Sequence, residues 1–261
     1  METISKYEIG KTLSRQFHEA EPFNYVVIDN FFEDEVADAI LAEFPEYDSS
    51  IWHVYSNAIE NKKTCNDWNK FPSMTYAVFN RLNSKEFLSK LNYLTNETLY
   101  SDPGLHGGGW HMHSRGGKLN VHLDYDIHPK LNLQRKLNLI VYMTKDWDPA
   151  WGGGLEFWSH DENLDAPKEC VVRVENKFNR AVIFDTTQNS WHGLPEPLNC
   201  PADKYRRSLA TYYLRDPKDA TTRKRALFAP YKDQVGDQKV IDLIKTRSDE
   251  SLYSKAYITN E

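Results

Sequence analysis

VHLDYD, residues 121–126, is the stretch that decides the fold and the class of function. Its apolar and polar residues alternate, and this period of two predicts a β-strand. The same period places His122 and Asp124 on one face of that strand. An imidazole and a carboxylate are two of the ligands of a non-haem Fe(II) site, whose third ligand would be a histidine from a distant strand. Most such pairs, taken alone, are surface hydrogen bonds and not metal ligands.

Composition narrows the class of protein. The chain has 261 residues, of which 40% are hydrophobic, and a formal net charge of −6, which fits one domain with a full core and gives no basic footprint for nucleic acid. No apolar run approaches the roughly 20 residues of a membrane span, and METISKYEIGK (1–11) has no signal-peptide core. Three widely separated cysteines indicate reduced thiols. We therefore expect a cytoplasmic protein that binds neither nucleic acid nor a membrane.

The middle of the chain has a β pattern. Short runs separated by turn residues, with no helical segment between them, predict a sandwich or jelly roll. The predicted strands are 118–125, 135–144, 154–159, 170–175, 180–185, 190–194 and 206–214. LNLIVYM (137–143) is apolar on both faces and is therefore expected to be a central strand.

The flanking regions predict supporting elements. A strand is expected at 23–32, a helix after Asp34, helical periodicity from Ser73 to Leu99, and a docked helix around 240–244. Residues 46–72 are interpreted as irregular chain and 101–110 as a loop. The predicted organisation is one domain over 1–261, with a strand and helical support at 23–100, a β core at 101–215 and a C-terminal helical extension at 216–261.

A third ligand and an inward-facing cation follow later in the chain. NSWHGLPEP (189–197) offers His192, 68 residues after Asp124. In RRSLATYYL (206–214), a period of two places Arg206 and Ser208 on one face. An arginine that points into a barrel is costly unless a carboxylate meets it, and a guanidinium beside a hydroxyl suits the terminal carboxylate of a ligand.

The strand 137–143 adds to this face. Asn138 and Tyr142 share one side of it, and Tyr142 is placed to offer its phenol to the same carboxylate.

The order His-x-Asp, distal His, Arg-x-Ser resembles the Fe(II)/2-oxoglutarate-dependent dioxygenases. Two segments are similar to the prolyl-hydroxylase-like branch of bacterial and phage type: LNLIVYMTKDWDPAWGGGLEFW (137–158) and FNRAVIFDTTQNSWHGLPEP (178–197). The resemblance covers roughly residues 23–215. It implies a mainly β fold, a double-stranded β-helix (jelly roll) with flanking N-terminal helices and a C-terminal helix.

The resemblance also implies the site. The iron ligands and catalytic residues would be His122, Asp124 and His192. Arg206 would pair with the distal carboxylate of 2-oxoglutarate, with Tyr142, Ser208 and Asn138 lining the cosubstrate pocket. Arg207 is the competing anchor if the strand register shifts by one residue. Fe(II), 2-oxoglutarate and O2 are the implied cofactor and cosubstrates, and ascorbate is an optional addition.

One part of the sequence departs from the resemblance. Many prolyl-hydroxylase-like proteins have a tyrosine upstream of the first ligand, where this chain has Trp110, His111, Met112 and His113. Met112 or His113 is expected to line the pocket instead. His111 and His113 also resemble a second ligand pair, but no carboxylate lies beside them, and we expect no second metal.

The implied reaction is hydroxylation of an unactivated C–H bond, with succinate and CO2 as coproducts. A prolyl residue of a peptide is the first candidate substrate; a free amino acid, a saccharide or another small molecule stays open. Arg135 and Trp151 are the preferred substrate contacts. The alternative is a cupin-like metal-binding jelly roll without 2-oxoglutarate chemistry, which explains the three ligands but not an inward Arg206.

Overall fold

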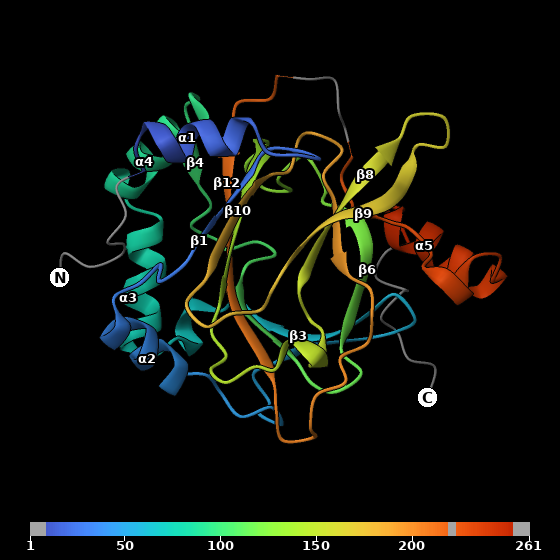
Figure 1. Cartoon of the computed structure of the whole chain (residues 1–261), viewed down its shortest axis with the longest axis horizontal. Helices are drawn as coiled ribbons and strands as arrows, with labels where there is room; N and C mark the ends of the chain where they lie inside the picture. The colour runs from blue at the N-terminus through green and yellow to red at the C-terminus, as the bar shows by residue number, and fades with distance from the viewer. Residues whose placement is uncertain (1–8, 219–222, 253–261) are drawn as a thin grey trace.

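The structure, a computed structural model, describes residues 9–218 and 223–252. In this part of the chain, thirteen strands form one sheet that curls into a barrel (Figure 1). The strands are β1 (Tyr25–Ile28), β2 (His53–Ser56), β3 (Glu60–Cys65), β4 (Tyr100–Ser101), β5 (Gly109–His113), β6 (Lys118–Leu123), β7 (Gln134–Tyr142), β8 (Leu155–Asp161), β9 (Ala166–Val174), β10 (Ala181–Asp185), β11 (Trp191–Leu194), β12 (Arg206–Arg215) and β13 (Leu227–Phe228).

The helices lie outside the barrel. They are α1 (Lys11–His18), α2 (Asp34–Ala42), α3 (Ser73–Leu82), α4 (Lys85–Thr95) and α5 (Gln238–Ser248), with short 3-10 turns η1 (Trp68–Lys70), η2 (Pro149–Trp151) and η3 (Lys232–Gln234). Figure 1 shows α1 to α4 on one side of the barrel and α5 on the other. No described helix has the length and apolarity that crossing a membrane requires.

The strand order identifies the fold. Along the sheet it is β1-β10-β7-β12-β5-β3-β6-β11-β8-β9, with antiparallel pairs throughout. β3 pairs with both β5 and β6 and so joins the two halves of the barrel. β6 and the much later β11 are direct neighbours. This is the expected double-stranded β-helix with helices at both ends, and the prediction of the fold class is confirmed.

The main core lies between the sheet and the helices. β7 is buried on both faces, as a central strand should be. Leu139 and Val141 of β7 pack in one cluster with Phe79 of α3 and Leu91 of α4. Asn138 and Ile140 on the opposite face of β7 line the interior of the barrel instead. The helices thus fix the outer face of β7, and its inner face is left free for a site.

One segment expected to be irregular contains strands, because residues 46–72 include β2 and β3. The expected loop at 101–110 is largely confirmed: residues 102–108 form turns between the end of β4 at Ser101 and the start of β5 at Gly109. β3 reads ENKKTC, and its inward face is polar because it lines a cavity, so the hydrophobic alternation that marks a strand is missing.

The expected helical stretch 73–99 is two helices. α3 ends at Leu82, and Ser84 caps α4, its hydroxyl accepting a hydrogen bond from the Phe87 amide. The predicted C-terminal helix is confirmed as α5, which packs through Val240 and Ile244.

Candidate metal and cosubstrate site

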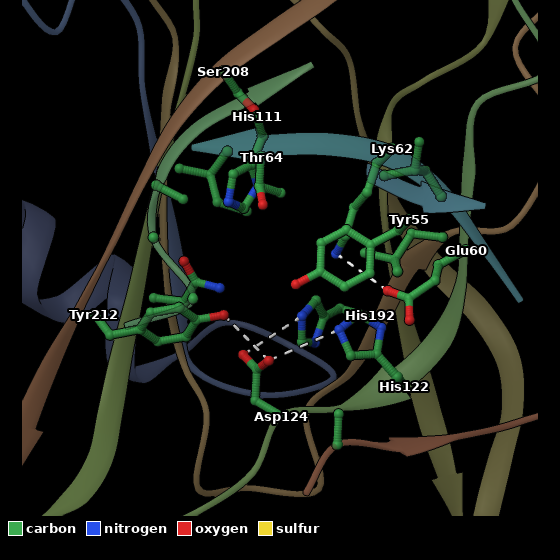
Figure 2. Close-up of a pocket in the computed structure, with 18 of the residues that line it drawn as sticks. Tyr55, Glu60, Lys62, Thr64, His111, His122, Asp124, His192, Ser208 and Tyr212 are labelled. Carbon is green, nitrogen blue, oxygen red and sulfur yellow. Dashed lines mark hydrogen bonds and ion pairs between the residues drawn. The ribbon is translucent and has the colours of Figure 1, made fainter. Parts of the chain in front are cut away.

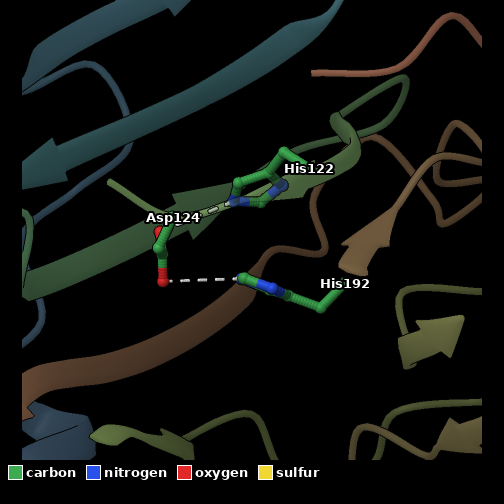
Figure 3. A group of neighbouring side chains, drawn as sticks. All are labelled: His122, Asp124 and His192. Atoms are coloured by element: carbon green, nitrogen blue, oxygen red, sulfur yellow. Dashed lines mark ion pairs between the residues drawn. The ribbon is translucent and has the colours of Figure 1, made fainter. Parts of the chain in front are cut away.

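Three side chains from two neighbouring strands meet at one end of the barrel. His122 lies on β6, Asp124 follows the end of β6, and His192 lies on β11 directly opposite His122. Their ligand atoms all lie within 4.8 Å of one another, and all three residues are buried (Figure 3). The sequence had placed these residues together, and in the described chain they are the group of three that could hold a metal ion.

Backbone carbonyls set the tautomer of both histidines. Nδ1 of His122 lies 2.9 Å from the Asn120 carbonyl, and Nδ1 of His192 lies 2.8 Å from the Ser190 carbonyl. Because a carbonyl oxygen only accepts, each Nδ1 donates and each Nε2 keeps its lone pair. Both Nε2 atoms lie 3.8 Å from a carboxylate oxygen of Asp124.

The protonation states suit a divalent cation. Burial lowers the pKa of His122 to about 3, with a further contribution from His192, and burial likewise lowers the pKa of His192. Burial alone would raise the pKa of Asp124, but His192 and Arg135 outweigh it and the net direction is down. Two neutral imidazoles therefore face one carboxylate, and Oδ2 of Asp124 has no hydrogen-bond partner in the described chain. This donor set fits Fe(II).

Further side chains hold Asp124 in place. The Tyr212 hydroxyl donates to Oδ1 of Asp124 at 3.2 Å, and a terminal nitrogen of Arg135 lies 3.8 Å from the same oxygen. The Arg135 guanidinium lies between the rings of Tyr125 and Tyr212, 3.6 and 3.5 Å from their centroids. Arg223 donates to the Asp124 backbone carbonyl at 2.8 Å. The carboxylate is therefore held from its side chain and from its backbone.

Replacing Tyr212 with phenylalanine is expected to weaken metal binding about tenfold, because loss of an outer-shell partner typically costs about 10–100-fold in affinity. The measurement is the dissociation constant for Mn(II). Tyr213→Phe is the matched control, because the Tyr213 hydroxyl donates to the Leu82 carbonyl on the helical side of the sheet. Equal affinities for the two variants would show that the Tyr212 hydroxyl does not support the site.

The triad opens into a cavity of about 560 Å³ inside the barrel (Figure 2). β12 contributes Arg206 and Ser208 to its wall, β7 contributes Asn138, and β5 contributes His111 and His113. Arg206 is 3% exposed, lies opposite His113 in the strand register and donates through Nε to the Gly153 carbonyl at 2.7 Å. The cavity thus contains a buried cation as well as the triad.

Buried polar atoms without partners lie near this arginine and farther along the barrel interior. In the described chain, Oδ1 of Asn138, the Tyr142 hydroxyl, both ring nitrogens of His113 and Nε2 of His111 are buried without a hydrogen-bond partner. Tyr142 is fully buried behind Arg206, whose guanidinium lies 4.9 Å from the Tyr142 ring centroid. Because buried polar groups normally find partners, this concentration marks a place for a polar, anionic ligand.

The structure distinguishes the two candidate arginines. Arg206 lines the cavity, whereas the guanidinium of Arg207 lies over the Tyr205 ring, 5.6 Å from its centroid, and is not part of the cavity wall. The register follows the period-of-two expectation, with Arg206 and Ser208 on the inner face of β12.

The absence of a side chain at Gly153 leaves room for the Arg206 side chain. Its φ is +81°, and a Cβ there would lie 2.8 Å from Leu198 Cδ2 and 3.1 Å from Arg206 Cδ. Gly153→Ala is expected to displace Arg206 and weaken 2-oxoglutarate binding about tenfold, the equivalent of about 1.4 kcal/mol. Gly152→Ala is the matched control, because Gly152 has nearly the same φ, +79°, and no atom within 4 Å of its Cβ position.

Calorimetric titration of the Mn(II)-loaded variants with 2-oxoglutarate measures the difference. If both substitutions weaken binding equally, backbone strain rather than displacement of Arg206 is responsible.

Of the remaining predicted contacts, Arg135 and His113 reach the cavity, and Trp151 and Met112 do not. Arg135 lines the cavity but is engaged with Asp124 and the two tyrosines. Trp151 is half-buried against Trp147, with ring centroids 5.2 Å apart, and is not part of the cavity wall. Met112 packs in the core on the outer face of β5, so of the two alternatives only His113 reaches the cavity.

Two further groups of residues line the cavity: one lies within residues 52–68, a segment that the sequence offers as a substrate-contacting loop, and sequence reasoning missed the other. Tyr55, Glu60 and Lys62 come from β2 and β3, and Arg225, Phe228 and Arg247 come from the C-terminal segment. The Phe228 ring stacks on His122, with centroids 4.9 Å apart and an interplanar angle of 20°. For the residues of β3, the sequence does contain a usable signal. A period of two within ENKKTC places Glu60, Lys62 and Thr64 on one face of a strand.

A buried triad of two histidines and one aspartate inside a double-stranded β-helix defines a non-haem metal site of the facial-triad class. Residues 108–215 match the family model described as the 2OG-Fe(II) oxygenase superfamily, where 2OG is 2-oxoglutarate. Fe(II) and 2-oxoglutarate are the metal and cosubstrate typical of it, and the His-x-Asp…His triad is present.

Among curated proteins, 65 residues of the chain are 32% identical to the mouse protein named prolyl 3-hydroxylase OGFOD1; this match covers 25% of the chain and only 12% of that relative's length. Among solved structures, a Pseudomonas putida prolyl-4-hydroxylase superimposes with a TM-score of 0.56, 16% identity and coverage of 78% of this chain and 100% of that chain.

A Trichoplax adhaerens prolyl hydroxylase, in complex with a peptide fragment of hypoxia inducible factor, superimposes with a TM-score of 0.55, 17% identity and coverage of 78% of this chain and 89% of that chain. At such identities, these likenesses establish the fold.

Proposed function

We propose that the protein hydroxylates an unactivated C–H bond, using Fe(II) held by His122, Asp124 and His192, and 2-oxoglutarate anchored by Arg206. The observation that carries the proposal is the coexistence of two features in one cavity: a metal-competent triad, and a buried arginine amid unpaired polar atoms. A cupin-like metal-binding jelly roll would need the first feature but leaves the second unexplained.

The residues have distinct tasks. The bound iron, with 2-oxoglutarate and O2, supplies the oxidising chemistry: one oxygen atom goes to the substrate as a hydroxyl, the other to succinate, and CO2 leaves. Arg206 pairs with the distal carboxylate of the cosubstrate, and Ser208, Asn138 and Tyr142 offer polar atoms beside it.

Arg135 has a different role from the one expected. Its guanidinium is already shared between Asp124 and the rings of Tyr125 and Tyr212. We therefore propose that Arg135 holds Asp124 in place and does not contact the substrate.

The leading substrate is a prolyl residue. The mouse relative and both solved structures are named as prolyl hydroxylases, and one of them is in complex with a peptide. A free amino acid is the second candidate, because the cavity of about 560 Å³ lies inside the barrel and has the size of a small-molecule site.

The test is an assay with Fe(II), ascorbate and 2-oxoglutarate across panels of prolyl peptides and free amino acids. The proposal requires a product that has gained one oxygen atom and an equal amount of succinate. Both must be absent when 2-oxoglutarate is omitted. Succinate without any oxidised product in either panel would leave the oxygenase class standing and reject both substrate classes.

A further inference from the structure

The strands β2 and β3 and helix α5 place a second charged group in the cavity wall, separate from the triad and from Arg206. It consists of Glu60, Lys62 and Arg247, with Tyr55 beside it. We propose that this group, with Lys62 as the principal contact, binds a carboxylate of the substrate. The inference rests on the proposed function and specifies the chemical class of its substrate.

The register of β3 directs Lys62 inward. Glu60, Lys62 and Thr64 line the cavity, whereas Lys63 points away and donates to the Tyr47 carbonyl at 2.6 Å. Figure 2 shows the Lys62 nitrogen entering the same space that the triad faces. In agreement with this, Lys62 contributes to lowering the pKa of both His122 and His192.

The group has one more positive charge than negative. Glu60 is 1% exposed and is shared by two cations, Nε of Arg247 at 3.2 Å and Nζ of Lys62 at 3.6 Å. The Lys62 side chain is only 15% exposed, yet its distance to Glu60 is longer than a hydrogen bond. Its other close contact is the Tyr55 ring, 5.1 Å from the nitrogen. An ammonium has three donors, so Lys62 has donors to spare for a ligand.

Neither the metal nor the cosubstrate removes this surplus. The charges of Fe(II), Arg206 and Arg135 exceed by one the charges of the two carboxylates of 2-oxoglutarate and of Asp124. A buried charge that the loaded site leaves uncompensated favours binding of an opposite charge. The surplus is positive, which suits the carboxylate group of a ligand.

The surroundings suit the rest of such a substrate. Tyr55, Tyr125 and Phe228 line the same cavity, and their rings offer apolar surface for a hydrocarbon portion. A substrate held by its carboxylate at Lys62 would extend over these rings towards the triad. A free amino acid, or a prolyl residue next to a carboxylate, satisfies this arrangement.

The test measures anion binding without turnover. The protein is loaded with Mn(II) and saturating 2-oxoglutarate and titrated with ¹³C-carboxylate acetate, whose nuclear relaxation increases when it binds near the paramagnetic ion. Acetamide, with a ¹³C carbonyl, is the neutral control. We expect saturable relaxation of acetate but not of acetamide. Equal behaviour of the two probes in the unmodified protein overturns the proposal without any variant.

Variants then test whether Lys62 is the residue that binds the anion. Lys62→Met and Lys62→Gln are expected to weaken acetate binding at least tenfold, and Lys63→Met, which makes the same charge change on the outer face of β3, should leave it unchanged. Equal effects at both positions contradict the assignment. Weaker 2-oxoglutarate binding in Lys62→Met would also overturn the assignment, because Lys62 would then contact the cosubstrate and not the substrate.

The two proposals fail in different ways. If the unmodified protein binds no 2-oxoglutarate, the proposed function fails. The comparison of Lys62→Met with the unmodified protein and with Lys63→Met, in the acetate titration with Mn(II) alone, then still decides whether Lys62 binds anions.

Discussion

Replacement of Asp124 by alanine is expected to abolish 2-oxoglutarate turnover and to weaken Mn(II) and Fe(II) binding by more than about 100-fold. Loss of an outer-shell partner typically costs up to about 100-fold, and loss of a charged ligand costs more. Asp124 supplies the only negative charge of the triad, and it joins two imidazoles that burial keeps neutral. The measurement is metal affinity by competition with a chelating dye, followed by a succinate assay.

Asp126→Asn is the matched control for this experiment. Asp126 lies in the same stretch of sequence but pairs with Arg223 at 2.7 Å and takes no part in the triad. The control should bind metal like the unmodified protein. Metal affinity that survives Asp124→Ala would mean that the ion binds elsewhere.

Arg206→Ala is expected to raise the dissociation constant of 2-oxoglutarate about 100-fold while leaving metal affinity unchanged. A charge-assisted pair with a carboxylate contributes roughly 1.5–3 kcal/mol, and about 2.7 kcal/mol corresponds to 100-fold. The arginine is buried beside Tyr142, and within the described chain its Nε donates to the Gly153 carbonyl, so its terminal nitrogens are available to a ligand. Calorimetry on the Mn(II)-loaded protein measures the effect.

The neighbouring residue provides the control. Arg207→Ala makes the same change one position along β12, on the face that contacts Tyr205. Weakened 2-oxoglutarate binding in Arg207→Ala, with normal binding in Arg206→Ala, would reverse the assignment of the anchor.

Local patterns were sufficient for the β core. β6, β7, β10, β11 and β12 lie within a few residues of the strands predicted from short β-like runs between turn residues. The pairing of His122 with His192 depends on the order of strands in the barrel. That order came from the resemblance to known oxygenases, because spacing alone does not specify which distant strands pair.

The wall contributed by β2 and β3 could not be predicted in the same way. Its strands lack apolar alternation because β2 is largely exposed and the inner face of β3 lines a polar cavity. Lys62 and Lys63 are adjacent and identical in the sequence, and only the register of β3 with β5 and β6 separates a cavity residue from an outward one. Similarly, Trp151 was expected to contact the substrate, but it packs on Trp147 and is not part of the cavity wall.

The most direct test of the central claim is an anaerobic titration of the metal-free protein, first with Fe(II) and then with 2-oxoglutarate, followed by visible absorption. Chelation of iron by the cosubstrate produces a weak metal-to-ligand charge-transfer band. We predict that the band appears with the unmodified protein, requires both additions, and is lost in Asp124→Ala. Tight iron binding without this band, at saturating 2-oxoglutarate, would contradict the account and would leave a metal-binding jelly roll in its place.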